Sequence, residues 1–493
     1  MERTPNKRRS SVDSYPMVRT LIPFIAGIIC CNEVDLPMWV WIAAILFSLF
    51  SLLVSLLPIC GRFLGLSLAV ALFSLGGSMV EVRSLLPKVP LGKPISMELE
   101  VDDNPVIRKK FRYASAHICW WEVDGRYYRH SQKVNLYVDS LVHYEQGNRI
   151  ETFARVVPFP EKFGSYGRLL KRRGYAGSVF LSPVEVLRLD STRRHTLQSR
   201  AVERLERLGL KGKDGAVVEA ISVGNRRALT TELRDAYARA GASHILAVSG
   251  LHIGIVFIFF NLILWWLPLL HHGQIIRAVT VIVPIWIYAA ICGFSPSVVR
   301  AALMFSALQM GVATSSRYVS LNALAATAFV MLLYRPDYLY DISFQLSFIA
   351  VLSILLFGVP MMSLLRTRSR VVNVLLSTVV IGVAASVATM PLVLYTFGRA
   401  SIVGVLLNPV VILGAYVIVV VSIIWIAMPI APLAGLFGTL LSSASSALNF
   451  VIESVSQWRW AALEASLPLW GVWLVYGVTI VFTIVLWYAE SKK

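Results

Sequence analysis

Charged residues are scarce in this chain, and that scarcity argues against an ordinary soluble protein. Of 493 residues, 15% are Asp, Glu, Lys or Arg and 56% are hydrophobic, whereas soluble domains carry about 25% charged residues. The composition therefore predicts a polytopic membrane protein. No small-residue cleavage site follows the first basic residues, so we expect the first apolar run to remain as an anchor with its N-terminal end in the cytoplasm.

Cysteine pairs and nucleotide-binding motifs are also missing. The five cysteines show no C-x-x-C and no spacing typical of metal ligands, which predicts neither a disulfide framework nor a zinc site. They are Cys30, Cys31, Cys60, Cys119 and Cys292. The sequence contains no G-x-x-x-x-G-K-[ST] phosphate loop. We therefore expect no bound metal or cofactor, and no ATP-driven motor within this sequence.

Apolar runs of spanning length occur in two groups. Three open the chain, and nine follow residue 240; a span needs about 20 apolar residues. The runs predict about twelve transmembrane helices. Basic residues of the later loops, with Arg366, Arg368 and Arg370 as the strongest cluster, fall on one side of the membrane when both termini are cytoplasmic. The positive-inside rule therefore supports this orientation.

The pattern of runs divides the chain into four parts. We expect a three-span membrane region at 1–87, a basic β-rich domain at 88–190, a helical linker at 191–240 and a larger membrane domain at 241–493. With three crossings before it, the β-rich domain lies outside the cytoplasm. The predicted fold is thus a polytopic α-helical membrane protein with an inserted, small, OB-like extracytoplasmic domain.

Alternation of apolar and polar residues predicts the strands of the β-rich domain. The run from Val123 to Arg126, with Asp124 and Gly125 at its centre, predicts a tight hairpin turn, because glycine tolerates the positive φ of such turns. Five strands with a short helix at 166–173 before the last are compatible with an OB-like barrel, and any other small β-domain is the alternative. The predicted strands are 95–101, 113–123, 127–138, 150–157 and 177–189.

The β-rich domain carries an excess of positive charge. Residues 81–195 contain 20 Lys and Arg against 13 Asp and Glu. Basic residues beside aromatic residues are typical of grooves for single-stranded nucleic acid, where cations bind phosphates and rings stack on bases; a solvated charged face is the alternative. The candidate DNA-binding residues are Arg108, Lys109, Lys110, Arg112, Arg168, Lys171, Arg172 and Arg173.

The stretch 241–254 combines membrane-like hydropathy with polar side chains. It contains Ser243, His244, Ser249 and His252, with Gly250 at its centre. Polar groups at membrane depth are costly, and a Ser-Gly pair is a place where a helix can kink or unwind. This pattern predicts a broken, cavity-lining helix start. The alternative is a helix cap and loop at the membrane surface, with Ser243 as the cap and both histidines as packing residues.

Three further polar residues interrupt the apolar runs of the larger membrane domain. Gln345 and Asn408 need hydrogen-bond partners in a low-dielectric setting, and Arg300 lies about one turn inside its predicted helix. Interrupted helices with several Gly, Ser and Pro breaks are typical of substrate pathways. For Arg300 the alternative is that its side chain reaches the membrane surface.

Several blocks in order resemble the ComEC competence family, the membrane channel of bacterial DNA uptake. The run 241–254 resembles the family's G-x-S-H-L-L-A-I-S-G-L-H signature. Later blocks at 293–301, 341–352, 389–398 and 407–409 resemble its G-F-S-P-S, F-Q-L-S-F, M-P-L and N-P motifs. The resemblance covers residues 215–430, and the order of the blocks makes it specific.

The resemblance implies a membrane channel, not an enzyme, that imports single-stranded DNA during natural transformation. His244, Ser249, Gly250, His252, Arg300, Gln345 and Asn408 would then line the path, and membrane lipid would surround it. Many family members also carry a metallo-β-lactamase-like nuclease domain. No H-x-H-x-D-H motif of that kind occurs here, so we expect a DNA receptor, a nuclease and an ATP-driven motor to be supplied in trans.

Two other classes of function stay open on the sequence. In an intramembrane serine hydrolase, Ser249 would be the nucleophile and His244 or His252 the base, although no acidic residue lies nearby and G-x-S-x-G is absent. A small-molecule permease would not need a basic β-domain.

Overall fold

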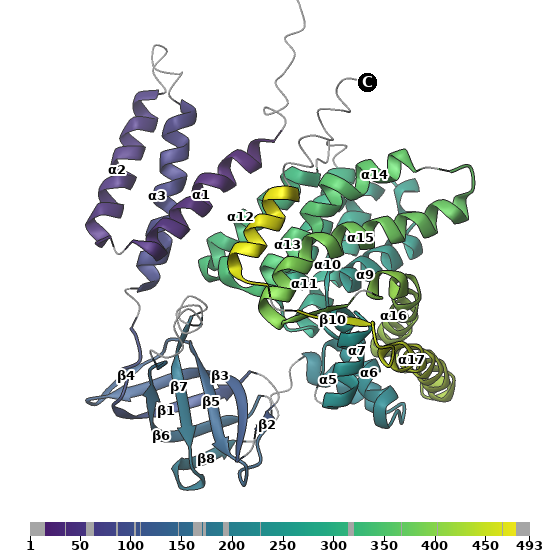
Figure 1. The fold of residues 1–493 in the computed structure, drawn as a ribbon, viewed down its shortest axis with the longest axis horizontal. Helices are drawn as coiled ribbons and strands as arrows, with labels where there is room; N and C mark the ends of the chain where they lie inside the picture. Colours follow the sequence, from purple (N-terminus) through teal and green to yellow (C-terminus); the bar gives the residue numbers. More distant parts are fainter. Residues whose placement is uncertain are drawn as a thin grey trace, which may run out of the picture. The chain divides into compact units, whose positions relative to one another are not determined.

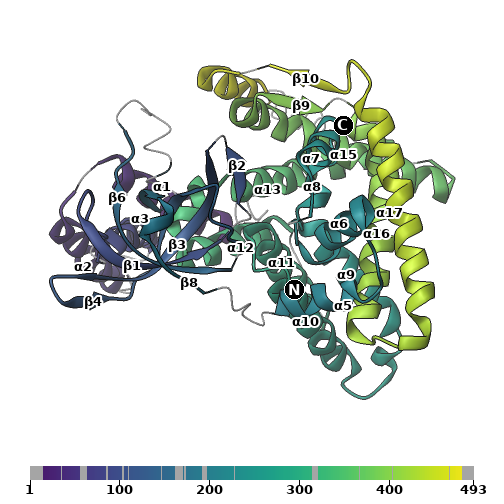
Figure 2. The ribbon, with the colours of Figure 1, turned by 90° about the horizontal axis from the view of Figure 1, so that it is seen from below.

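The computed structural model describes most of the chain and divides it into two compact units, which we treat separately. The first unit comprises 1–194 and 328–341, and the second comprises 195–327 and 342–493. Figure 1 and Figure 2 show the elements in two views. The described residues are 15–34, 36–55, 64–84, 87–102, 105–108, 110–145, 147–160, 170, 174–190, 197–226, 228–313, 320–365, 367–401, 403–465 and 467–479.

Three apolar helices open the first unit, where the sequence predicted three spans. They are α1 (Pro16–Glu33), α2 (Met38–Ser55) and α3 (Leu64–Ser84). Glycine allows α1 and α3 to pack closely, since a Cβ on Gly27 would lie 2.0 Å from the carbonyl oxygen of Phe73. Phe24 of α1 also packs on Phe329 of α12 (Ser320–Tyr334), with ring centroids 4.8 Å apart.

A closed β-barrel follows these helices (Figure 1). The barrel strands run in the order β1-β3-β5-β7-β6, and pairing of β6 with β1 closes the ring. The β5–β7 pair is parallel and the other barrel pairs are antiparallel. A closed five-stranded barrel is the architecture of the OB fold. The strands are β1 (Pro94–Val101), β2 (Val106–Arg108), β3 (Phe111–Val123), β4 (Arg126–Tyr128), β5 (Gln132–Asp139), β6 (Arg149–Val157), β7 (Tyr175–Leu181) and β8 (Val186–Asp190).

The predicted strands are recovered, with two corrections. The run 127–138 is two strands, β4 and β5, and the run 177–189 is also two, β7 and β8. The second split follows from a 3-10 turn in which Glu185 and Ser182 form a capping box. The predicted hairpin turn is confirmed, since Asp124 and Gly125 have φ of 50° and 71°. The predicted helix at 166–173 lies outside the described residues apart from Leu170.

Alternation explains the core of the barrel. Inward residues of the central strands, such as Ala116, Leu136 and Val179, have no exposed surface. Their neighbours along each strand point to the outer face, because successive side chains of a strand alternate. The sequence therefore determines which residues line the outer face once the register is set.

The second unit is helical throughout its main part. Its first helices pack on the later membrane helices in one hydrophobic core, and α16 and α17 lie side by side (Figure 2). Thr230 caps α7 through its side-chain oxygen, as expected of this residue type. The helices are α5 (Leu197–Glu206), α6 (Gly212–Val223), α7 (Thr231–Arg239), α8 (Ser243–Leu246), α9 (Gly250–Ile263), α10 (Gly273–Ile291), α11 (Pro296–Ala313), α13 (Ile342–Ser353), α14 (Val359–Leu364), α15 (Arg370–Phe397), α16 (Gly404–Ala427) and α17 (Ala434–Ser456), with short strands β9 (Arg399–Ser401) and β10 (Ala462–Glu464).

The helices are those of a membrane protein, but the predicted number of about twelve spans is not confirmed. Within the described ranges, 7 helices are long and apolar enough to cross a membrane. Shorter apolar helices coincide with the five remaining runs, namely at Met38–Val54, Gly250–Ile263, Ser320–Tyr334, Ile342–Gly358 and Leu469–Thr479. The structure shortens α9 because the run 245–268 is interrupted before Gly250.

Candidate functional site

The stretch 241–254 is broken into two helices, as the sequence predicted. The four-residue helix α8 ends at Leu246, and α9 begins at Gly250. Between them the backbone is extended, with Ser249 at φ −127° and ψ 179°. The Ser249 Oγ accepts a hydrogen bond from the Leu251 amide at 3.3 Å. Ser249 is thus the N-cap of α9. The alternative in which Ser243 is a side-chain cap is wrong, because the N-cap of α8 is Ala242 and Ser243 is the first residue of that helix.

His252 completes this cap from the first turn of α9. Its Nδ1 accepts a hydrogen bond from the Ser249 amide at 3.1 Å and lies 3.2 Å from the Ser249 Oγ. An amide can only donate, so Nδ1 carries the lone pair and the proton of a neutral ring sits on Nε2. The ring is fully buried, and Nε2 has no hydrogen-bond partner among the described residues. His252 therefore offers an unused donor.

Arg300 of α11 lies against the start of α9. A Cβ on Gly250 would sit 2.8 Å from the Arg300 Nη2, so glycine makes room for the guanidinium. Arg300 is 6% exposed, and its Nε and Nη1 have no hydrogen-bond partner among the residues that the structure describes. Its guanidinium carbon lies 5.7 Å from the ring centroid of Phe348 on α13. Burial of this side chain removes the alternative in which it reaches the membrane surface.

The other predicted path residues lie at different places. His244 on α8 is exposed, and its Nδ1 lies 3.1 Å from the Gly241 carbonyl oxygen. Gln345 lies three residues before Phe348 on α13, hence on the same side of that helix. Asn408 of α16 faces α15, where its Nδ2 lies 3.1 Å from the position of a Cβ on Gly382. The structure brings Gly250, Arg300 and the Ser249–His252 cap together; convergence of all seven residues on one path stays a prediction.

A row of aromatic rings crosses the outer face of the barrel on three neighbouring strands. Tyr113 of β3 pairs with Tyr137 of β5, which pairs with Phe180 of β7. The ring centroids of the first pair are 5.0 Å apart, and those of the second are 4.8 Å apart and stacked. Phe111 contacts Phe180 edge-on, and the Lys133 Nζ lies 5.9 Å from the Tyr175 ring centroid. We call Phe111, Tyr113, Tyr137 and Phe180 the aromatic row.

Most of this row cannot be recognised in the sequence alone. The basic clusters stand beside aromatic residues, whereas Tyr137 and Phe180 stand alone between apolar neighbours. Their signal is the outward position in each strand, and it becomes visible only when the register aligns the strands.

The predicted basic residues of the barrel are only partly described. Lys110 is exposed beside β3, and Arg108 belongs to β2. Arg112 is partly engaged within the fold, since its Nε donates to the Ser140 carbonyl oxygen at 3.3 Å and its Nη2 lies 3.1 Å from the His143 Nδ1. The predicted residues Lys109, Arg168, Lys171, Arg172 and Arg173 lie outside the described residues.

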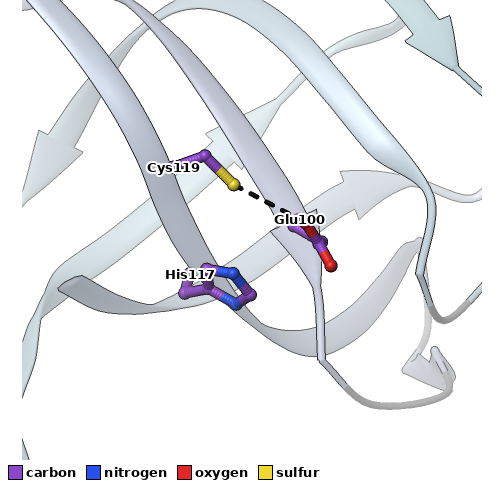
Figure 3. A group of neighbouring side chains, drawn as sticks. All are labelled: Glu100, His117 and Cys119. Carbon is purple, nitrogen blue, oxygen red and sulfur yellow. Dashed lines mark hydrogen bonds between the residues drawn. The ribbon is translucent and has the colours of Figure 1, made fainter. Parts of the chain in front are cut away.

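Three possible metal ligands meet on another part of the barrel, although the sequence suggested none. Glu100 of β1 and His117 and Cys119 of β3 place their ligand atoms within 4.8 Å of one another (Figure 3). The Cys119 Sγ lies 3.8 Å from the Glu100 Oε2. The sequence shows only that His117 and Cys119 are two residues apart and therefore lie on the same face of a strand. Glu100 is brought beside them by the pairing of β1 with β3.

Charge pairing within this cluster weakens the case for a metal. Arg149 donates to the Glu100 Oε2 at 2.9 Å, so that carboxylate is already neutralised. The His117 Nδ1 lies 2.5 Å from the Asp102 Oδ1. The bond to Asp102 is the main cause that raises the pKa of His117 to about 10, with a smaller contribution from Cys119. A metal ion needs neutral imidazole, so it would have to displace a proton held by this pair. The cluster is therefore better explained as an ion-pair network than as a metal site.

The fold is that of a polytopic membrane protein with a small closed β-barrel. In its helical unit the chain is interrupted between α8 and α9, and Gly250 leaves room beside the start of α9. The model of the Competence protein family matches residues 221–491, more than half of the chain. The chain therefore belongs to the Competence protein family, as the motifs indicated.

Two relatives are similar to part of this chain. ComE operon protein 3 of Bacillus subtilis (strain 168) is 30% identical over 192 residues, which are 39% of this chain and 24% of that protein. An uncharacterized protein of Aquifex aeolicus (strain VF5) is 30% identical over 224 residues, which are 44% of this chain and 51% of that protein. The matches thus span about a quarter of the first relative and about half of the second. No solved structure matches.

Proposed function

We propose that this protein imports single-stranded DNA across the bacterial cytoplasmic membrane during natural transformation. The β-barrel receives the strand outside the cytoplasm, and the helical unit conducts it. Membership of the Competence protein family supports a role in DNA uptake. The observation that carries the proposal furthest is the aromatic row on the outer face of the barrel.

The aromatic row suits unpaired bases. Every base has a flat face, so stacking on aromatic side chains binds single strands without sequence preference. Phe111 is 40% exposed and Phe180 is 47% exposed, so their faces are accessible in the barrel. Lys133 lies on the same strand as Tyr137, four residues away, and supplies positive charge beside the row.

The row also lies where OB folds bind oligonucleotides. That face is formed by the second and third barrel strands and by the loops after the first and fourth. Here the corresponding strands are β3 and β5. The predicted cluster Arg108 to Lys110 falls in sequence between β1 and β3, and the predicted cluster at 168–173 falls between β6 and β7. Both basic clusters therefore fall in the two connections of the chain that, in OB folds, carry the loops beside a bound strand.

In the helical unit, the proposed path passes the broken helix start. His244, Ser249, Gly250, His252, Arg300, Gln345 and Asn408 are the proposed lining residues, in a unit otherwise held together by apolar packing. Both termini are proposed to be cytoplasmic. A DNA receptor, a nuclease and an ATP-driven motor are proposed to act in trans.

The test is labelled-DNA uptake in a deletion strain complemented with this chain. Surface-bound and nuclease-protected DNA are measured separately, with matched amounts of protein in the membrane. We expect complementation to restore nuclease-protected DNA, while the deletion strain keeps its surface-bound DNA. Equal protected DNA with and without the chain contradicts the proposal.

One contact favours a second candidate, an intramembrane serine hydrolase. The His252 Nδ1 lies 3.2 Å from the Ser249 Oγ, within reach for a base and its nucleophile. However, Nδ1 already accepts the Ser249 amide hydrogen, and Nε2 has no carboxylate partner among the described residues that would orient the ring. A helix cap accounts for the same contact, so we place import first.

A further inference from the structure

We propose that the start of α9 and Arg300 form an internal binding site for a phosphodiester group of the transported strand. This inference rests on the proposed function, which it deepens by naming the chemical group that the broken helix start binds. The ligand chemistry is a phosphate oxyanion held between the first turn of α9 and the guanidinium of α11.

Three buried hydrogen-bond donors at this site have no acceptor among the described residues. The Nε and Nη1 of Arg300 and the Nε2 of His252 are buried and lack hydrogen-bond partners within the described ranges. All three are N–H groups, because arginine only donates and the His252 Nδ1 accepts the Ser249 amide hydrogen. Buried polar groups are nearly always hydrogen-bonded. A site that offers only unused hydrogen-bond donors suits a ligand that only accepts hydrogen bonds.

The electrostatics of the site also favour an anion. The first amides of a helix carry partial positive charge and are a common binding place for phosphate. Here the guanidinium of Arg300 lies against Gly250, the first residue of α9. Two positive groups at close range repel each other, and the ring of Phe348 offsets only part of the cost of burying the cation. An anion between them would offset both the repulsion and the unfavourable burial of the guanidinium.

Gly250 leaves room for the guanidinium at the start of α9. A Cβ at this position would lie 2.8 Å from the Arg300 Nη2 and 3.4 Å from the Ala301 Cβ. The helix start is therefore accessible to the guanidinium only because this residue has no side chain. Phosphate-binding helix starts use glycine for the same reason, so that the backbone can approach the ligand closely.

The test uses the full chain in nanodiscs of a phosphate-free galactolipid, with inorganic phosphate as the probe at constant ionic strength. We expect saturating phosphate to raise the Tm of the wild type by about 2–4 °C, since a ligand that binds the folded state stabilises it. Arg300→Met should lose the shift, and Arg300→Lys should keep part of it. The matched control is Arg399→Met, because Arg399 is an exposed arginine of the same unit paired with Asp235 at 3.0 Å; its shift should equal that of the wild type.

Without phosphate, Arg300→Met should be at least as stable as the wild type, because it removes a buried cation that has no counter-ion among the described residues. Equal phosphate shifts in the wild type and Arg300→Met would overturn the proposal. A large loss of stability in phosphate-free buffer would also overturn it, because Arg300 would then hold the fold together.

Two arms distinguish the source of the phosphate. A thymidine dinucleotide with its natural linkage should reproduce the shift, and its uncharged methylphosphonate analogue should not. If adding phosphatidylglycerol to the nanodisc abolishes the response to the dinucleotide, the site binds a lipid headgroup and the phosphodiester assignment is wrong. Nuclease-protected uptake that persists without any phosphate shift refutes this site alone, whereas a phosphate shift without uptake refutes the import function.

Discussion

The outer face of the barrel and the start of α9 both gather positive charge, but they balance it differently. On the barrel, Arg149 binds Glu100 at 2.9 Å and lies 3.5 Å from Glu98, and His117 is paired with Asp102. At the start of α9, Arg300 is buried beside a helix N-terminus, and two of its nitrogens lack a partner within the described part of the chain.

The difference separates a structural charge from a charge available to a ligand. A paired cation on a partly exposed face is satisfied by its own fold. A buried cation without a counter-ion is destabilising until something binds it. The barrel is therefore expected to bind a strand mainly through exposed rings, and the helix start mainly through unpaired donors.

The largest expected effect is at Gly250. Gly250→Leu should reduce nuclease-protected DNA nearly to the level of the deletion strain, because its side chain would collide with Arg300, which lies 2.8 Å from a Cβ at this position. Ser249→Ala should keep uptake within about tenfold of the wild type, since loss of an N-cap costs about 1 kcal/mol. The measurement is uptake at matched protein levels. The reverse order, with Ser249→Ala inactive and Gly250→Leu active, indicates the hydrolase.

An intermediate effect is expected on the aromatic row. Phe180→Ala should weaken single-stranded DNA binding about 5- to 160-fold, since one stacked base contributes about 1–3 kcal/mol. Fluorescence anisotropy with a labelled thymidine oligomer and the full chain in nanodiscs measures the dissociation constant at fixed salt. Tyr127→Ala is the matched control, because Tyr127 is an exposed ring of β4 outside the row. Equal losses in both variants would mean that the row has no special part in binding.

The smallest expected effect is a pH dependence of the barrel. Asp102 raises the pKa of His117 to about 10, so their pair stabilises the fold fully below the unfolded pKa of about 6.5 and loses this contribution as pH rises towards 10. Partial exposure reduces the expected loss to about 2 kcal/mol or less. Groups that also face His117 are Glu100, Cys119 and, on the neighbouring strand, Lys133.

Hydrogen exchange of the β1 and β3 amides, corrected for intrinsic rates, measures this loss between pH 6.5 and 10. His117→Asn is the comparison, because it keeps a polar side chain without the titration. Barrel amides whose opening free energy changes with pH equally in both proteins would show that the pair contributes nothing.

Local patterns in the sequence determined much of the fold. The apolar composition indicated a membrane protein, alternation gave the barrel strands, and Asp124-Gly125 predicted the hairpin turn. The break before Gly250 could also be predicted, because a Ser-Gly pair between apolar residues is a local feature of the sequence. Each of these depends on the periodicity or the backbone freedom of neighbouring residues, which the chain carries without its tertiary contacts.

The tertiary structure alone decided which residues meet. Pairing of β3 with β5 and of β5 with β7 aligns Tyr113, Tyr137 and Phe180 into one row, and pairing of β1 with β3 brings Glu100 to His117. Packing of α11 on α9 places Arg300 against Gly250, fifty residues earlier in the chain. Register, barrel closure and helix packing set these contacts, and they arise from the balance of many distant interactions that no single stretch of sequence contains.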